Sequence, residues 1–491
     1  MRLFVFLIAL TSFISCGDPA GATATSSGND GIASTVTTAS LAARQLESPD
    51  IRVTLAGASP EGALLIGQFA EQQYKAAQGV VDGNSVVFKQ SEPFKPGHYY
   101  AYFTDGSAMQ MLIDEDQTFS LSGTRNGPFS GVQVEGSLDN QLLFETLAFE
   151  AGMADEFRLV TQGLGQLQAG SPGYVELEAD RAALVAKREA FQDERFNKHP
   201  NSIYTAFKRA GRNPRLRDIR LTDGTLDEVA QVDGFREDFW NGVNFADIRL
   251  LNTPVIFNKL KRYITELTPQ NANAIIKSSE MLMEKVLPHP EYFKFIANWI
   301  TLQYEPGKTT VMDGAAIHVH MVQNYFTKER AFWSDSMTVY GLQQRADQMA
   351  YSLVGQQGPD ITVPGIDGKP KRLYDLKKPY IAVFMFNPDC EHCIEETPKL
   401  VQVYEGLKNE LDIYAIALDT EADKWKAFVK QYGLDKFTNV YDPTNRSIFK
   451  TYYVDNTPEL YLLGPDRKIV SKNLKVTQLA QAIQIAKSKS K

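Results

Sequence analysis

The spacing of apolar side chains changes along the chain and divides most of it into three predicted regions. In residues 49–145 apolar and polar positions alternate, as at Ile51, Val53 and Leu55, and turn sequences such as Asp82-Gly83-Asn84 separate the runs. A period of two is typical of strands with one buried face. We therefore predict an antiparallel β module, either one sheet or a small sandwich. No catalytic or metal-binding spacing occurs in this region, which favours a structural or interaction role.

Residues 146–350 show apolar side chains at helical spacing, with prolines such as Pro254 and Pro288 at the joints. A period near 3.6 without internal breakers is typical of amphipathic helices. The segments expected to be helical are 175–191, 245–266, 270–286, 291–304 and 316–327. The region is therefore predicted to be a mostly helical module.

Residues 356–491 alternate between strand and helix patterns. The unbroken apolar run Tyr380–Phe386 is typical of a central strand that is buried on both faces. The other predicted elements are a helix from Cys390 to about Leu407, a strand over 411–418, a helix over 425–432, a hairpin over 459–463 and 468–470, and a helix over 476–487. This order predicts an α/β domain with a mixed sheet.

The first residues have the pattern of an export signal. An apolar run follows Arg2 and is too short to span a bilayer, so residues 1–15 are predicted to be a signal peptide. The run ends in Ser15-Cys16-Gly17, which resembles a bacterial lipoprotein cleavage box. The resemblance implies cleavage before Cys16 and lipid attachment to it; the alternative is an ordinary secretory signal. Residues 16–48 are rich in small and polar residues, so we expect a flexible tether there.

Composition excludes several classes of protein. The chain has 491 residues, of which 43% are hydrophobic, so it is long and apolar enough to build packed cores. Its net charge of -8 argues against a nucleic-acid partner. Only three cysteines are present, which excludes a disulfide-stapled scaffold and a four-cysteine zinc site.

Two further features of the helical region invite a functional interpretation. Six basic residues lie between Lys208 and Arg220, and we expect them to form a solvated, salt-bridged face. His318 and His320 are two positions apart, a spacing that would bring both rings to one face only in a strand. Because the surrounding pattern is helical, we expect structural histidines and no metal site.

The main candidate for chemistry is Cys390-Glu391-His392-Cys393, at the point where a buried strand ends and a helix begins. Unpaired backbone N–H groups and the helix dipole at this position favour the thiolate of Cys390. Cys393 follows one helical turn later. Cys390 is therefore predicted to attack a partner disulfide, and Cys393 is predicted to resolve the mixed disulfide.

Other chemistries do not fit the spacing around this motif. A zinc site needs further ligands, and a c-type haem site needs a histidine where Ile394 stands. No histidine follows His392, as a copper-delivery site would require. Thiol peroxidases place proline and threonine upstream of their cysteine, where this chain has Ala382 and Asn387. We expect no metal and no cofactor.

Further residues around the motif carry a family resemblance. They are the segment Phe386–Cys393, Pro398, the segment Asn456-Thr457-Pro458, and the stretch from Gly358 to Pro364. The chain from about Gly355 onwards resembles the exported, membrane-anchored thiol–disulfide oxidoreductases of the TlpA/ResA type, in the thioredoxin-like superfamily. The resemblance implies that Pro458 is cis and lies against a redox-active Cys390–Cys393 pair, and that Thr457 hydrogen-bonds the extended chain of the substrate.

The residues between and beside the cysteines are expected to adjust the potential. His392 can donate a hydrogen bond or positive charge to the Cys390 thiolate, whereas Glu391 disfavours a second negative charge. The chain departs from the family at two positions. Asp389 stands where many relatives carry tryptophan, and Phe384 stands where thioredoxins proper bury an acidic residue.

The N-terminal regions show a less specific resemblance. Phe239-Trp240, Leu251–Pro254 and Trp333 resemble an uncharacterised helical module of Bacteroidota-type lipoproteins, and Val134–Asn140 resembles the β module at their N-termini.

Taken together, the sequence predicts thiol–disulfide exchange on protein or peptide disulfides, with a thiol-relay electron partner in the membrane. The expected location is the periplasmic side of the outer membrane, through the lipid anchor, or else the cell surface. The alternatives are a lipid-anchored binding or scaffold protein whose dithiol is secondary, and a thiol peroxidase.

Overall fold

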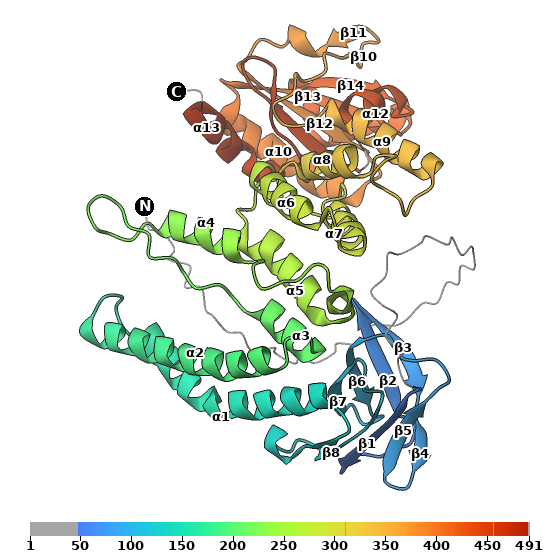
Figure 1. Ribbon diagram of the computed structural model, residues 1–491. Helices are drawn as coiled ribbons and strands as arrows, with labels where there is room; N and C mark the ends of the chain where they lie inside the picture. Colours follow the sequence, from blue (N-terminus) through green and yellow to red (C-terminus); the bar gives the residue numbers. More distant parts are fainter. Residues whose placement is uncertain (1–47, 310, 455, 490–491) are drawn as a thin grey trace. The chain divides into compact units, whose positions relative to one another are not determined.

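The computed structural model describes residues 48–489 except residues 310 and 455 (Figure 1). The predicted signal peptide, Cys16 and all but the end of the predicted tether lie outside these residues. In the described part of the chain, every helix is too short or too polar to cross a membrane. The three predicted regions follow one another as β, helical and α/β structure.

The β region consists of two sheets that share one hydrophobic core. The first has the order β4-β5-β1-β8-β9, with β4 Val80–Asp82, β5 Ser85–Lys89, β1 Asp50–Ala56, β8 Thr118–Thr124 and β9 Gln133–Glu135. The second has the order β3-β2-β6-β7, with β3 Gln72–Gln78, β2 Leu64–Phe69, β6 Gly97–Tyr102 and β7 Ala108–Ile113. Ile51, Val53 and Leu55 of β1 all point into the core, as their alternation predicts.

One strand pair departs from the antiparallel prediction. β1 and β8 pair in parallel, with Ile51 opposite Phe119, whereas the other pairs of both sheets are antiparallel. Parallel strands need a long connection. Here the chain between β1 and β8 forms β4 and β5 of the first sheet and the whole second sheet, and then returns to pair with β1. Local alternation of side chains contains no information about such a return.

The helical region begins earlier than its pattern suggests, because Ser137 caps α1 by accepting a hydrogen bond from Asn140 N. Its helices are α1 Leu138–Gln166, α2 Pro172–Lys198, α3 Ile203–Gly211, α4 Glu228–Asp238, α5 Pro254–Arg262, α6 Ala272–Val286, α7 Pro290–Gln303, α8 Gly314–Tyr325 and α9 Ser336–Ala350. Short helical turns lie at Phe129–Gly131, Ile248–Asn252 and Tyr263–Leu267. Thr253 caps α5 and Pro254 occupies its first turn, which explains the predicted joint.

The basic run and the paired histidines have local partners. Lys208 lies 3.1 Å from Glu150, Arg212 2.6 Å from Asp193 and Arg217 2.8 Å from Asp238; Arg215 pairs with Glu189 and Arg220 with Asp218. The run is therefore a salt-bridged face, as predicted. His318 and His320 lie on α8: the first contacts the Thr301 carbonyl at 3.0 Å, and the second lies 3.2 Å from Glu280.

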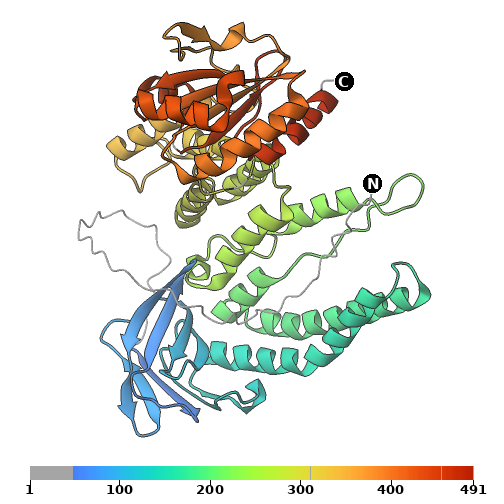
Figure 2. The same cartoon turned by 180° about the vertical axis from the view of Figure 1, so that it is seen from behind.

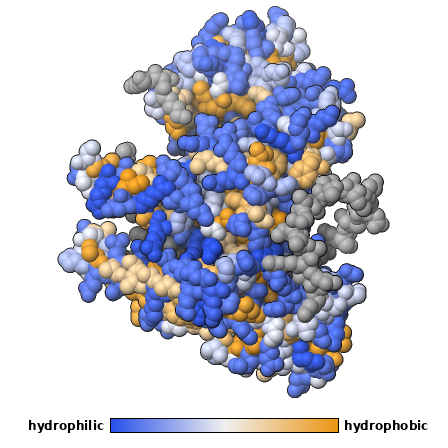
Figure 3. Space-filling model, viewed as in Figure 1, coloured by the Kyte–Doolittle hydropathy of each residue, from blue (hydrophilic) through white to orange (hydrophobic). Residues whose placement is uncertain are grey.

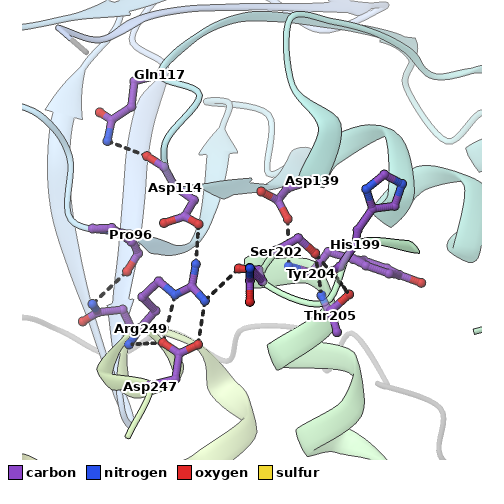
Figure 4. A network of polar contacts seen from close by, with 12 residues as sticks. Pro96, Asp114, Gln117, Asp139, His199, Ser202, Tyr204, Thr205, Asp247 and Arg249 are labelled. Carbon is purple, nitrogen blue, oxygen red and sulfur yellow. Dashed lines mark hydrogen bonds and ion pairs between the residues drawn. The ribbon is translucent and has the colours of Figure 1, made fainter. Parts of the chain in front are cut away.

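A partly buried arginine joins the β region to the helical region (Figure 4). Arg249 contacts Asp114, which follows β7, and lies 2.6 Å from Asp247. It also donates to the Asn201 carbonyl at 3.2 Å. Asp114 is 6% exposed. One guanidinium therefore satisfies groups from three separate stretches of chain.

The α/β region is built on a mixed sheet of order β14-β13-β12-β15-β16. Its strands are β14 Thr438–Asp442, β13 Leu411–Leu418, β12 Tyr380–Phe386, β15 Glu459–Leu463 and β16 Ile469–Ser471, and a hairpin of β10 Thr362–Pro364 and β11 Pro370–Arg372 precedes them. Its helices are α10 Glu391–Leu407, α11 Ala422–Tyr432, α12 Arg446–Tyr452 and α13 Leu479–Lys489, with short turns at Leu373–Asp375, Leu434–Lys436 and Val476–Gln478.

The central strand β12 is buried on both faces, as its unbroken apolar run predicts. Ala382 and Phe384 belong to the core on one face of the sheet, and Ile381 and Val383 belong to the core on the other. β12 pairs in parallel with β13 and antiparallel with β15. Figure 2 shows this sheet, with its helices, from the back of the view in Figure 1.

Candidate active site: the dithiol at the start of helix α10

The turn between β12 and α10 places the first cysteine. Cys390 is the N-cap residue of α10, and its backbone N–H donates to the Asn387 carbonyl at 3.0 Å. The Asn387 side chain accepts from the Asp389 N–H at 2.8 Å and donates to the Asp419 carbonyl at 3.0 Å. Asn387 therefore fixes the turn, a role that the sequence did not indicate.

The two sulfur atoms lie in different surroundings. Cys390 is half-buried, whereas Cys393 is fully buried among the core residues beneath the sheet. The backbone N–H of Asn387 points at the Cys393 sulfur from 3.4 Å, and the Thr397 hydroxyl donates to the Cys393 carbonyl at 2.6 Å. Access from solvent is therefore greater for Cys390.

The electrostatics of the two thiols differ in the same sense. Burial raises the pKa of Cys390, but hydrogen bonds from the backbone and thiol of Cys393, from the Thr457 side chain and from the backbone of His392 outweigh it and lower this pKa overall. Burial raises the pKa of Cys393 to about 12, and the neighbouring Cys390 adds to the increase. The geometry thus provides one thiol suited to attack and one that stays protonated near neutral pH.

The loop that precedes β15 also contributes to the site. The peptide bond between Thr457 and Pro458 is cis, as the family resemblance implies. The Cys390 thiol donates to the Thr457 carbonyl at 3.1 Å. A residue far along the chain therefore contacts the first sulfur directly.

The two residues between the cysteines are exposed. The side chain of His392 is 78% exposed, and its Nδ1 lies 3.9 Å from Oε2 of Glu395. The backbone N–H of His392, by contrast, contributes to lowering the pKa of Cys390. Glu391 is the first residue of α10. The structure therefore places the backbone of His392 at the sulfur and its ring beside Glu395.

The positions where the chain departs from its family also have structural roles. Asp389 lies 2.8 Å from Lys424 of α11, across the mouth of the site. Phe384 is buried and stacks on Phe386, which in turn stacks on Phe428. An apolar stack therefore stands where thioredoxins proper bury an acid. In the described ranges, no three His, Cys, Asp or Glu side chains are close enough together to hold a metal ion.

Known proteins place this site in a family. Residues 354–472 match the AhpC/TSA family. The thiol-disulfide oxidoreductase ResA of a Bacillus cereus strain is 32% identical over 120 residues, which are 24% of this chain and 68% of the relative. The chain belongs to the ResA family. The ResA of Bacillus thuringiensis subsp. konkukian is 28% identical over 156 residues, 32% of this chain and 78% of the relative. This ResA-family chain is a thiol–disulfide oxidoreductase with a thioredoxin-like fold in its C-terminal part.

One solved structure matches a longer stretch of the chain. A thioredoxin-like protein from Bacteroides caccae ATCC 43185 has 17% sequence identity and a TM-score of 0.46, and the match covers 55% of this chain and 98% of that one.

Proposed function

We propose that Cys390 and Cys393 carry the thiol–disulfide exchange, on protein or peptide disulfides outside the cytoplasm. The observation that carries the proposal is the opposite direction of the two pKa shifts, with the lowered pKa on the more accessible thiol. The thiolate is the nucleophile in disulfide exchange. Cys390 is therefore the attacking residue and Cys393 the resolving one.

The exchange proceeds in two steps. The Cys390 thiolate attacks one sulfur of the partner disulfide, so that a Cys390–partner bond forms and the second partner sulfur leaves as a thiolate. Cys393 then gives up its proton, for which that thiolate is a suitable acceptor, and attacks Cys390. The partner leaves with both sulfurs reduced, and Cys390–Cys393 becomes a disulfide. Two electrons have passed to the partner, and the reverse sequence oxidises it.

Thr457 and Pro458 are proposed to dock the partner chain, and His392 and Glu391 to adjust the potential. The contact between Cys390 and the Thr457 carbonyl supports docking, because it places the backbone of this loop at the reacting sulfur. The proposal also includes export, a lipid anchor at Cys16 in the outer membrane, and a thiol-relay partner in the membrane that restores the dithiol. The pattern of residues 1–16 supports the anchor.

The test is a trapping experiment with the full chain. Cys393→Ala should accumulate mixed disulfides with insulin on non-reducing gels, because the resolving thiol is absent. Cys390→Ala should trap almost nothing, and the double variant should not reduce insulin. Trapping by Cys390→Ala instead would reverse the assignment. Insulin reduction that survives in the double variant, or faster consumption of hydrogen peroxide than of insulin, would contradict the proposal.

A further inference from the structure

The loop that reaches the dithiol is held from the helical region. Tyr453 ends α12, four residues before Thr457, and its side chain is only 8% exposed. Its side chain packs in the core of the helical region rather than in either core of the thioredoxin-like sheet. The Phe449 ring lies beside it, 4.8 Å between ring centroids. Figure 1 shows α12 next to α9, which belongs to the helical region.

An arginine of α9 fixes the tyrosine. The Nε atom of Arg345 donates to the Tyr453 hydroxyl, and its guanidinium lies 5.8 Å from the centroid of the ring. Glu305, which follows α7, lies 3.8 Å from Arg345 and 2.8 Å from Lys308. Arg345 therefore links the hydroxyl of Tyr453 to Glu305, in a second segment of the helical region.

The backbone of Tyr453 requires such support. Its φ of 52° lies in the left-handed region, which is unfavourable for a bulky residue and persists where surrounding structure holds it. Packing of the ring and the Arg345 contact provide this support. The helical region therefore supports the conformation of Tyr453, where the chain leaves α12.

Two more contacts lie along the same boundary. A Cβ atom at Gly307 would come within 3.3 Å of Asn456 Nδ2, so the turn after α7 lies against the residue that precedes Thr457. Asp313, before α8, accepts from the Val354 N–H at 2.8 Å. The helical region thus contacts the loop of Thr457 directly and the start of the thioredoxin-like part as well.

We propose that Arg345 is a positioning residue for disulfide exchange: through Tyr453 it holds the Thr457–Pro458 loop in the form that receives a partner chain. The inference rests on the proposed docking role of Thr457. If the docking loop is ordered in only a fraction of the molecules, the apparent affinity for a partner is reduced by that fraction. The helical region therefore contributes to the affinity for substrates without touching the reacting sulfurs.

The experiment separates docking from the reactivity of Cys390. Arg345→Ala should raise KM for a disulfide-bonded peptide about tenfold, the effect of losing one hydrogen bond to a charged group, with little change in kcat. The rate at which iodoacetamide alkylates Cys390, measured at a pH at which this thiol is fully ionised, should not change, because this small reagent needs no docking loop. Tyr453→Phe should also raise KM, and Arg345→Lys should restore part of the loss.

The matched control is Arg330→Ala. Arg330 donates to the Asn324 carbonyl at 2.7 Å. Its guanidinium, like that of Arg345, lies 5.8 Å from an aromatic centroid, that of Tyr325, within the helical region. If Arg345→Ala has the KM of this control, or if its alkylation rate changes together with KM, the inference is wrong. A wild type that reduces no peptide overturns the proposed function, and the inference with it. An active wild type with an unaffected Arg345→Ala overturns the inference alone.

Discussion

Cys390 and Cys393 are the same residue type three positions apart, yet their surroundings move their pKa values in opposite directions. The cause is position in the helix. Cys390, at the N-cap, faces unpaired N–H groups, whereas Cys393, one turn on, faces the apolar core. The Cys-x-x-Cys pair thus separates the proposed attacking and resolving thiols through hydrogen bonds at the first sulfur and burial of the second.

The contribution of His392 can be divided between its backbone and its ring. The His392 N–H is among the groups that lower the pKa of Cys390 against the effect of burial. Proline at this position removes the N–H and is tolerated in the first helical turn. His392→Pro should therefore destabilise the thiolate and lower the reduction potential by a few tens of millivolts, where about 30 mV corresponds to about 1.4 kcal/mol.

His392→Ala is the matched control, since it removes the ring and keeps the N–H. We expect its potential to stay near that of the wild type in a redox titration against glutathione. An equal fall in both variants would assign the effect to the ring. No fall in the proline variant would mean that His392 does not adjust the potential at all.

At this scale the sequence indicates the candidate residues better than their contacts. The spacing of Cys390 and Cys393 predicts a site at a strand–helix junction, and the structure has both residues at the start of α10. The direction of the His392 ring depends on a side-chain rotamer, and the contact with Glu395 follows only once α10 is built. The role of Asn387 depends on its hydrogen bond to the Asp419 carbonyl, which follows β13. No local sequence pattern indicates this contact.

Among the elements, the long apolar strands were predicted, and so was the short hairpin of β15 and β16, which a turn sequence marks. Elements without a clear signal, such as β14 and α12, were not predicted. β12 and β13 have long apolar runs, and their bounds agree with the prediction. β14 has only five residues and α12 only seven, too few to establish a period. The parallel pairing of β1 with β8 and the contact of Arg249 with Asp114 join residues far apart in sequence, so these contacts could be identified only from the folded structure.

The Arg249 contacts make a prediction about the joint between the β and helical regions. Arg249→Met leaves Asp114 buried without its cation, which should cost about 3 kcal/mol of stability at neutral pH. The loss is measured by denaturant unfolding. Arg217→Met is the control: Arg217 also pairs with two carboxylates, Glu237 and Asp238, but is 44% exposed, so its loss should destabilise the protein much less.

The same variant should depend on pH in a defined direction. Burial raises the pKa of Asp114 to about 6, although Arg249 acts against this. Between about pH 4 and pH 6 the folded protein therefore keeps a proton on Asp114 that the unfolded chain has already released. The contribution of Asp114 to the free energy of unfolding falls as pH rises towards 6. Without Arg249 the pKa rises further, so the deficit of Arg249→Met should shrink on going from neutral pH to about pH 5. A deficit independent of pH would contradict this account.

At the scale of the whole molecule, some residues belong to the hydrophobic core of a region other than their own. Tyr453, from the thioredoxin-like part, packs in the core of the helical region, and Leu112 of β7 belongs to that core as well. On the face shown in Figure 3, hydrophilic residues predominate and apolar residues form separate patches. The shared core residues Tyr453 and Leu112 therefore join the three regions through packed side chains.

The last prediction concerns the attachment of the protein to the membrane. If Cys16 is the lipidated first residue of the mature protein, Cys16→Ser should move the protein from the membrane to the soluble fraction. A single acyl chain binds a membrane weakly, so stable anchoring takes at least two. The measurement is fractionation after a carbonate wash. Cys390→Ser, which removes a different thiol, should remain in the membrane fraction, so that the shift reports the anchor and not cysteine loss in general. The soluble Cys16→Ser protein should still reduce insulin, because the dithiol and its docking loop are unchanged. Retention of Cys16→Ser on membranes after the wash would contradict the lipid anchor and leave the dithiol chemistry standing on its own evidence.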